Sequence, residues 1–170
     1  MERIIVIGCP GSGKSTFSKK LHMKTGIHLF HLDMLYWNID KTVVEKDVFM
    51  QRLENIIHEE SWIIDGNYES TIDIRLEACD TVFFLDYPVE LCIKGIKCRK
   101  GKARTDMPWI EKIGEEDEEF ITFVKNYNII NKPTILSLLN NADNKNIIIF
   151  KSREESKEYL DFHLKKKYNK

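Results

Sequence analysis

The sequence predicts a doubly wound α/β domain with a parallel sheet. Five short apolar runs rich in β-branched residues alternate with segments of helical character along the 170-residue chain. Such alternation is typical of parallel sheets with helices on both faces. A glycine-rich segment directly follows the first run, as in many α/β folds that bind a ligand at the ends of their strands. At about 150 residues per domain, the length predicts one domain.

Each predicted strand is a short apolar run, and the runs lie at residues 3–7, 28–31, 62–65, 81–86 and 146–150. The first, RIIVI, contains no polar residue after its arginine, which indicates a strand buried on both faces. Helices are expected between the strands, at about residues 15–24, 42–57, 71–79, from Pro88, from 115 to 139 with a break near Pro133, and from Ser152. Gly26 should end the first helix. Thr42 with Glu45 and Ser152 with Glu155 have the spacing of capping boxes, which predicts helix starts there.

Composition excludes several classes of protein. The chain is 42% hydrophobic and 31% charged, with a net charge of −1, so it is neither disordered nor strongly basic. A dedicated duplex-DNA-binding domain is usually basic, and we therefore do not expect direct DNA binding. The four cysteines form no CxxC pair, which predicts free thiols. We find neither a signal peptide nor an apolar run of membrane-spanning length, and expect a cytoplasmic monomer.

The glycine-rich segment GCPGSGKS matches the phosphate-loop pattern GxxxxGK[ST] in full. Glycines let backbone N–H groups turn toward a triphosphate, and the following helix adds the positive end of its dipole. We expect Lys14 to reach the β- and γ-phosphates and Ser15 to bind Mg²⁺. ATP and Mg²⁺ are the predicted cofactors, bound through Gly8, Pro10, Gly11, Ser12, Gly13, Lys14, Ser15 and Thr16. The alternative is a glycine-rich turn that binds nothing.

Three aspartates fall at or just after predicted strand ends: Asp33, Asp65 and Asp86. In a parallel sheet these ends share the edge that carries the phosphate loop. Asp65 and Asp86 are therefore candidates, with Ser15, for holding Mg²⁺. Asp33 is the candidate for binding or deprotonating an acceptor hydroxyl, and Asp65 is also expected to contribute to acceptor binding. Each aspartate could instead be a helix cap or a turn residue.

Further candidates for acceptor binding surround these aspartates. Arg75 could reach a phosphate of the acceptor, or could be an ordinary surface arginine. Trp37 and Tyr68, together with Tyr36, could stack on a base or could close a small core. Their position after the second and third predicted strands favours the ligand-binding edge of the sheet.

A basic segment follows the fourth predicted strand and its helix, with cations at Lys94, Lys97, Arg99, Lys100, Lys102 and Arg104. Arginines that close over a transferring phosphoryl group stabilise its charge, so Arg99 and Arg104 are candidate catalytic residues. Gly95 and Gly101 could act as hinges for such a lid. A solvated basic helix and a nucleic-acid-binding patch are the alternatives.

Several sequence segments together resemble one known family. The phosphate loop, HLDMLYW, WIIDGNY, TIDIRLEACD, FFLDYP and GKARTDMP occur in this order. They resemble the adenylate kinase-related proteins of the DNA topology modulation (FlaR) type, over residues 3 to about 160. The resemblance implies a nucleoside monophosphate kinase-like P-loop fold with strand order 2-3-1-4-5. It also implies an acceptor-binding insertion at about 33–60 and a lid at about 97–114.

The expected function is that of an ATP-dependent small-molecule kinase, which transfers the γ-phosphate to a nucleotide or a small hydroxylated acceptor. The chain departs from adenylate kinases after its Asp-Gly pair, where Asn67 and Tyr68 replace proline and arginine, and its lid has fewer arginines. These departures keep a non-enzymatic ATP-binding regulatory protein as an alternative. A nucleic-acid-associated protein that affects DNA topology is the third hypothesis, based on the basic segment at 94–104.

Overall fold

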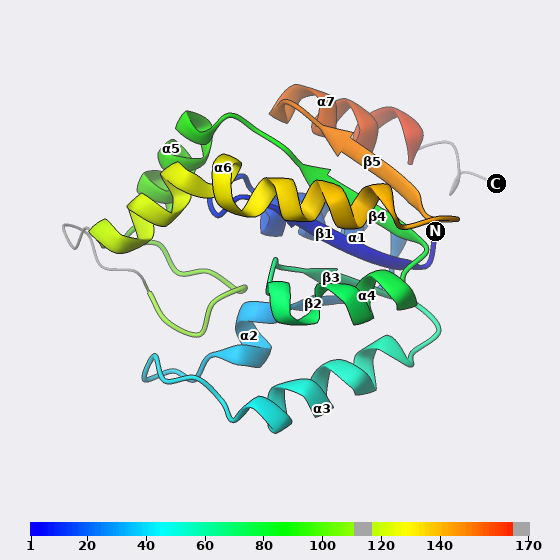
Figure 1. Ribbon diagram of the computed structural model, residues 1–170, viewed down its shortest axis with the longest axis horizontal. Helices are drawn as coiled ribbons and strands as arrows, with labels where there is room; N and C mark the ends of the chain where they lie inside the picture. The colour runs from blue at the N-terminus through cyan, green and yellow to red at the C-terminus, as the bar shows by residue number, and fades with distance from the viewer. Residues whose placement is uncertain (111–116, 165–170) are drawn as a thin grey trace.

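Five parallel strands form the centre of the structure (Figure 1). The computed structural model describes residues 1–110 and 117–164. The strands are β1 (Arg3–Gly8), β2 (Leu29–His31), β3 (Trp62–Asp65), β4 (Thr81–Leu85) and β5 (Asn146–Phe150). They lie side by side in the order β2-β3-β1-β4-β5. The predicted α/β fold class, the parallel sheet and the strand order are therefore confirmed.

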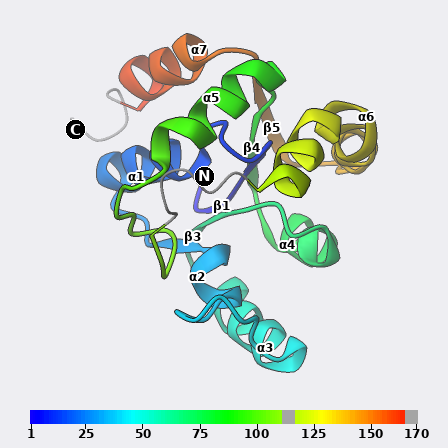
Figure 2. The ribbon, with the colours of Figure 1, turned by 90° about the vertical axis from the view of Figure 1, so that its left-hand side faces the viewer.

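Helices cover both faces of this sheet. Figure 2 shows α1 (Lys14–Thr25) and α7 (Arg153–Glu158) on one side, with α4 (Ile72–Ala78) and α6 (Glu118–Asn140) on the other. Beyond β2 lie α2 (Leu32–Tyr36) and α3 (Lys46–Ile57), and α5 (Val89–Arg99) crosses one end of the sheet. Two single turns, η1 (Glu69–Thr71) and η2 (Tyr159–His163), complete the regular structure.

The buried core explains the composition of β1. This strand pairs with β3 on one edge and with β4 on the other, so it is the middle strand of the sheet. Its residues Ile4, Ile5, Val6 and Ile7 have no exposed surface. A strand covered on both faces needs apolar side chains on both, which is why its sequence does not alternate with polar residues.

The two predicted capping boxes have different outcomes. Ser152 caps α7 as predicted, because its hydroxyl accepts a hydrogen bond of 3.1 Å from the backbone N–H of Glu155. The prediction at Thr42 is wrong, since α3 begins at Lys46. The Thr42 hydroxyl instead donates to the carboxylate of Asp40 at 2.6 Å, within a turn. Threonine side chains readily make such local bonds, which compete with helix capping.

The predicted break at Pro133 is also wrong, because α6 runs continuously through this residue. Proline leaves the carbonyl four residues earlier without its helical donor. That carbonyl belongs to Ile129, which is strongly exposed, so water can replace the missing donor. The helix start predicted at 115 and the lid residues 111–114 lie outside the described residues.

The carboxyl ends of the strands gather at the left of Figure 1. The loop after β1, α2 and the segment of residues 100–110, called the lid segment below, meet there with α5. This edge is where open parallel sheets bind ligands. None of the helices formed by the described residues has both the length and the hydropathy that a membrane crossing requires.

Candidate active site

A cavity of about 1160 Å³ opens at the carboxyl ends of the strands. Its walls come from the loop after β1, α1, α2, the end of β3, α5 and the lid segment. The structure brings most of the predicted site residues to it: Pro10, Gly11, Ser12, Gly13, Lys14, Ser15, Thr16, Asp33, Trp37, Asp65, Tyr68, Arg99 and Arg104. Gly8, Arg75 and Asp86 are predicted site residues that do not line this cavity.

The phosphate loop leads into α1 through a glycine with a positive φ. Gly13 is the N-cap of α1 in a left-handed conformation, with φ of 99°, which strongly favours glycine. The amine of Lys14 turns back to donate to the carbonyls of Gly8 at 2.8 Å and Cys9 at 3.2 Å. Burial lowers the pKa of Lys14, while the carboxylates of Asp65 and Asp33 oppose that shift. A positively charged amine near a helix N-terminus can receive a phosphate.

The loop packs directly against α5. A Cβ on Gly95 would lie 2.1 Å from the carbonyl oxygen of Gly11, and a Cβ on Gly11 would lie 2.1 Å from that of Cys92. Both distances are far below van der Waals contact, so only glycine fits at either position. The prediction that Gly95 is a hinge is therefore wrong: it lies inside α5 and allows close helix–loop packing. Gly101 lies just beyond the helix, with a positive φ of 75°.

Asp65 reaches the cavity from the end of β3. His31 lies in register with it on β2, and its Nδ1 is 2.7 Å from Asp65 Oδ1. The other oxygen, Oδ2, is buried and has no hydrogen-bond partner among the described residues. A buried, unpaired carboxylate oxygen is costly unless a water or cation binds it. The contact between His31 and Asp65 was not predicted from the sequence, although the strand order places the strand of His31 beside β3.

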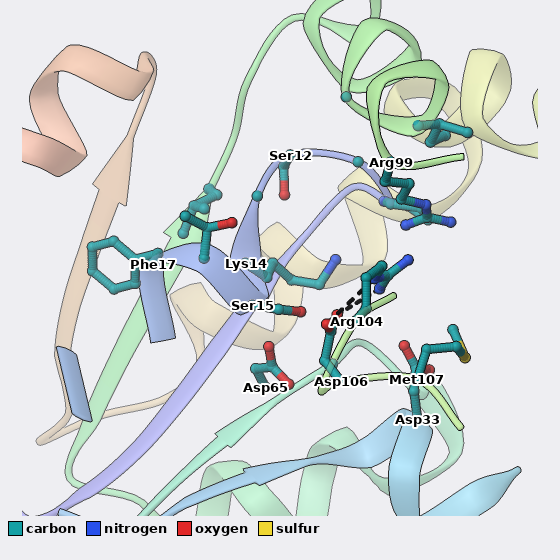
Figure 3. A pocket seen from close by; sticks show the side chains of 18 of the residues that line it. Ser12, Lys14, Ser15, Phe17, Asp33, Asp65, Arg99, Arg104, Asp106 and Met107 are labelled. Carbon is teal, nitrogen blue, oxygen red and sulfur yellow. Dashed lines mark hydrogen bonds and ion pairs between the residues drawn. The ribbon is translucent and has the colours of Figure 1, made fainter. Parts of the chain in front are cut away.

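Asp33 faces the same space from α2. The hydroxyl of Tyr68 donates a 2.7 Å hydrogen bond to Asp33 Oδ1. Burial raises the pKa of Asp33 above its ordinary value, and the hydrogen bond from Tyr68 and the charge of Lys14 oppose the shift. Figure 3 shows Lys14, Asp33 and Asp65 around one space, so the predicted phosphate and acceptor residues come together.

Arg75 has a different place from the one that acceptor binding would require. Its side chain is fully buried, and its guanidinium donates to the carbonyls of Gly66, Asn67, Tyr68 and Thr71. Burial lowers the pKa of Arg75 to about 10. The arginine therefore holds the loop after β3 in shape, because each of its three nitrogens donates to a backbone carbonyl.

Asp86 does not line the cavity that Ser15 and Asp65 line. Lys132 and Lys151 contact its two oxygens, at 2.7 Å and 2.5 Å. Burial alone would raise the pKa of Asp86, but the two lysines outweigh it and hold the pKa below its ordinary value. The structure does not bring Asp86 to the cavity, because its carboxylate ties β4 to α6 and to the end of β5.

Asp106 is a second residue that sequence reasoning missed. It extends from the lid segment and is almost completely buried. Arg104 Nη2 lies 2.5 Å from its Oδ2 (Figure 3). Lys19 Nζ lies 3.3 Å from its Oδ1. Burial would raise the pKa of Asp106, but hydrogen bonds from Arg104 and Ser15 hold it well below its usual range. The available signal was its position as the one acidic residue of KCRKGKARTDMP.

Aromatic rings join the lid segment to the segment after β2. Trp109 packs edge-on against Trp37, with ring centroids 5.3 Å apart. Tyr36 packs against both Trp37 and Tyr68. Trp37 and Tyr68 line the cavity, whereas Tyr36 does not. The predicted aromatic cluster thus includes both packing and cavity-lining side chains. Across the site, Arg99 lies over the ring of Phe120, with its Cζ atom 5.8 Å from the centroid.

Magnesium and ATP fit the residues that line this cavity. Ser15 and the unpaired oxygen of Asp65 are the available oxygen donors beside the phosphate loop. Among residues 1–110 and 117–164, no group of three or more His, Cys, Asp and Glu side chains could hold a metal by itself. Mg²⁺ in phosphoryl-transfer sites is commonly held by one or two protein oxygens together with substrate phosphates, so this arrangement is compatible with it.

Two solved kinase structures match this protein over nearly the whole chain. Deoxyadenosine kinase from M. mycoides with bound dATP is 20% identical with a TM-score of 0.52, and the match covers 95% of this chain and 98% of that chain. Shikimate kinase from Bacteroides thetaiotaomicron is 15% identical with a TM-score of 0.57, covering 96% and 97%. Comparisons with protein-family models and with curated proteins gave no match. The chain has the α/β P-loop NTPase fold found in these kinases.

Proposed function

We propose that this protein is an ATP-dependent small-molecule kinase, which transfers the γ-phosphate of ATP to an acceptor bound beside Asp33. One observation carries the proposal. The amine of Lys14 and the carboxylates of Asp33 and Asp65 face one cavity behind a complete phosphate loop. Its volume of about 1160 Å³ exceeds that of a typical single-ligand pocket, so a donor and an acceptor can both be accommodated.

Each part of the site has a proposed task. The backbone of the phosphate loop and Lys14 bind the β- and γ-phosphates, with the N-terminus of α1 adding its dipole. Ser15 and Asp65 hold Mg²⁺, which when bound neutralises phosphate charge. Arg99 and Arg104 place positive charge beside the transferring group, where it stabilises the transition state. Because the chemistry needs little beyond charge and alignment, these positions are the main contribution to rate.

The likeness to deoxyadenosine kinase and shikimate kinase supports a small-molecule acceptor. The resemblance to adenylate kinase-related proteins of the DNA topology modulation type supports ATP as the donor. Both inferences are part of the proposal. Whether the acceptor is a nucleotide or a small hydroxylated molecule is the question for the experiment.

The test follows phosphorus by NMR in a mixture of purified protein, Mg·ATP and a panel of nucleosides, nucleoside monophosphates and small hydroxylated metabolites. We expect ADP and one phosphorylated acceptor. Lys14→Ala should lower turnover by about 100-fold or more, because it removes the positive charge that stabilises the negative charge developing on the transferred phosphoryl group. Lys24→Ala is the matched control: it lies on the same helix, outside the cavity, and should keep full activity.

Three results would contradict the proposal. The first is turnover by Lys14→Ala within a few-fold of wild type. The second is ATP that binds but remains unchanged with every acceptor, which would favour the regulatory alternative. The third is release of free phosphate at the same rate with and without each acceptor, which would indicate an ATPase.

A further inference from the structure

We infer that His31 is a positioning residue for the magnesium site: its imidazole holds one oxygen of Asp65 and leaves the other oxygen for the metal that binds with ATP. The inference rests on the part of the proposed function in which Ser15 and Asp65 hold Mg²⁺. It gives a role to a side chain that does not itself line the cavity. Three features carry it: the register of two strands, the unequal oxygens of Asp65, and the contrast with the ion pairs of Asp86.

Strand register brings His31 and Asp65 together. Each is the last residue of its strand, and the two are partners in the register of β2 with β3. Side chains alternate between the two faces along a strand, so residues in register project from the same face of the sheet. Nδ1 of His31 lies 2.7 Å from Oδ1 of Asp65. The two side chains are only 11% and 5% exposed, so water screens this contact far less than it screens a surface pair.

The hydrogen bond leaves the two oxygens of Asp65 in different situations. An ionised carboxylate can only accept, so Nδ1 of His31 carries the hydrogen and Oδ1 accepts it. Within residues 1–110 and 117–164, Oδ2 of Asp65 is the one buried carboxylate oxygen that has no hydrogen-bond partner. Burying such an oxygen costs free energy, which the binding of a cation or its water would offset. Asp65 is therefore able to bind a ligand through Oδ2.

The position of Asp65 beside the phosphate loop indicates which ligand this is. Asp65 and Ser15 line the same cavity, and Figure 3 shows their side chains near each other below Lys14. The charge of Asp65 acts on Lys14, because it opposes the lowering of the lysine pKa by burial. A carboxylate in this place would repel bound phosphates unless a cation binds to both. A divalent cation shared by Ser15, Asp65 and phosphate oxygens meets this requirement.

His31 restricts a motion that the sheet leaves free. The main chain at Asp65 is fixed, since this residue pairs with His31 on one side and with Val6 of β1 on the other. The carboxyl group of an aspartate nevertheless rotates over a broad range about its bond to Cβ. The hydrogen bond from His31 limits this rotation, so the same oxygen stays available to the metal. Partners of this kind commonly change metal affinity 10- to 100-fold when they are removed, by about the same factor in activity.

Asp86 shows how a structural carboxylate differs. It also follows a strand end, but Lys132 contacts one of its oxygens at 2.7 Å and Lys151 contacts the other at 2.5 Å. Both oxygens are used, and the residue does not line the cavity. Asp65 has its contact with His31 at one oxygen and none at the other. A link between β2 and β3 does not require a buried oxygen without a partner, whereas a metal ligand does.

The experiment measures ATP binding by isothermal titration calorimetry without an acceptor, once with Mg²⁺ and once with EDTA. The metal-dependent gain is the ratio of the Kd in EDTA to the Kd with Mg²⁺. His31→Leu removes the hydrogen-bond donor, and it should lower this gain by about tenfold. The Kd in EDTA should stay within about twofold of wild type, because the phosphate loop itself is unchanged. A merely structural role for His31 would weaken binding equally under both conditions.

Three further variants keep the test specific. His31→Asn should keep the gain within about threefold of wild type, because its amide nitrogen is as many bonds from the backbone as Nδ1. His28→Leu is the matched control and should change neither Kd, since this histidine is exposed, directly precedes β2 and does not line the cavity. If circular dichroism shows that His31→Leu does not fold, His31→Gln replaces it. Its donor lies one bond farther out, so the gain should again fall.

A double-mutant cycle tests whether His31 acts through Asp65. Asp65→Asn should lower the metal-dependent gain by itself, because the neutral amide is a weaker metal ligand. His31→Leu added to Asp65→Asn should then have no further effect on the gain. A full effect of His31→Leu in this background would show that the histidine acts on the metal by another route, and would overturn the inference.

The outcomes separate the inference from the proposed function. An unchanged gain in His31→Leu, or a wild type that binds ATP no more tightly with Mg²⁺, would overturn the inference; phosphoryl transfer by that wild type would leave the kinase function standing. Transfer to no acceptor would overturn the kinase function. A gain that is lost in His31→Leu and kept in His31→Asn would then still support His31 as a positioning residue for Mg·ATP binding.

Discussion

Gly95 allows a test in which two physical effects oppose each other. It lies inside α5, where alanine is intrinsically favoured over glycine by about 1 kcal/mol. A methyl group there would lie 2.1 Å from the carbonyl oxygen of Gly11. Inserting a methyl group into a filled space costs up to about 3 kcal/mol. We use this upper value because the methyl group would meet backbone atoms, which move less readily than a side chain. We therefore expect Gly95→Ala to lower the free energy of unfolding by about 2 kcal/mol.

Chemical denaturation followed by circular dichroism measures this change, which corresponds to a fall in Tm of roughly 4–8 °C for a chain of this size. Lys97→Ala is the control, since Lys97 is exposed on the same helix and outside the cavity. Its stability should stay within about 0.5 kcal/mol of wild type. ATP affinity should also fall in Gly95→Ala, because the clash displaces the phosphate loop. A variant that is as stable as wild type, or more stable, and binds ATP normally would refute the close-packing argument.

Three further predictions follow from buried charges. Arg75→Lys should lower the unfolding free energy by about 3 kcal/mol, because one ammonium cannot serve four carbonyls; unchanged urea unfolding would contradict this. Asp86 has a lowered pKa, so its stabilising pairs with Lys132 and Lys151 persist at neutral pH. They are lost as the pH falls below about 3.9 and through the folded pKa. The free energy of unfolding of Asp86→Asn should be lower than that of wild type at pH 7, but should fall less than that of wild type between pH 5 and 3. Equal values for the two proteins at every pH would show that the pairs contribute nothing. Asp106→Asn removes a negative charge beside Ser15 and should tighten ATP binding by about fivefold, measured calorimetrically. Weaker binding would show that the carboxylate instead helps to position nucleotide.

Local patterns determined how much of the structure could be predicted. The apolar run of β1 and the phosphate loop are adjacent in sequence, so a short stretch of residues predicts both the central strand and the nucleotide-binding loop. The helix after Ser152 is likewise set by a hydroxyl and a backbone N–H three residues apart. The strand order came from the resemblance to a known family, because apolar runs alone do not reveal which strands are neighbours.

The predictions for Asp86 and Gly95 failed because they depend on partners that are distant in sequence. Asp86 follows a strand end like Asp65, but its role is decided by two lysines, 46 and 65 residues further along the chain. Gly95 has the sequence context of a hinge, and only the approach of Gly11 shows why a side chain is excluded there. A local pattern can identify residues that stand near a sheet edge, but it cannot reveal which of them are already bonded.

The perpendicular contact between Trp37 and Trp109 gives the protein an optical reporter of its own. The chain has three tryptophans, and the third, Trp62, is fully buried at the start of β3 and does not line the cavity. The other two, Trp37 and Trp109, lie at the junction between the segment after β2 and the lid segment, so their absorption and emission report on that junction. Opening or closing of that junction on addition of ligand would alter tryptophan emission and near-ultraviolet dichroism. Stopped-flow fluorescence could therefore time the motion in the native protein, without an attached dye.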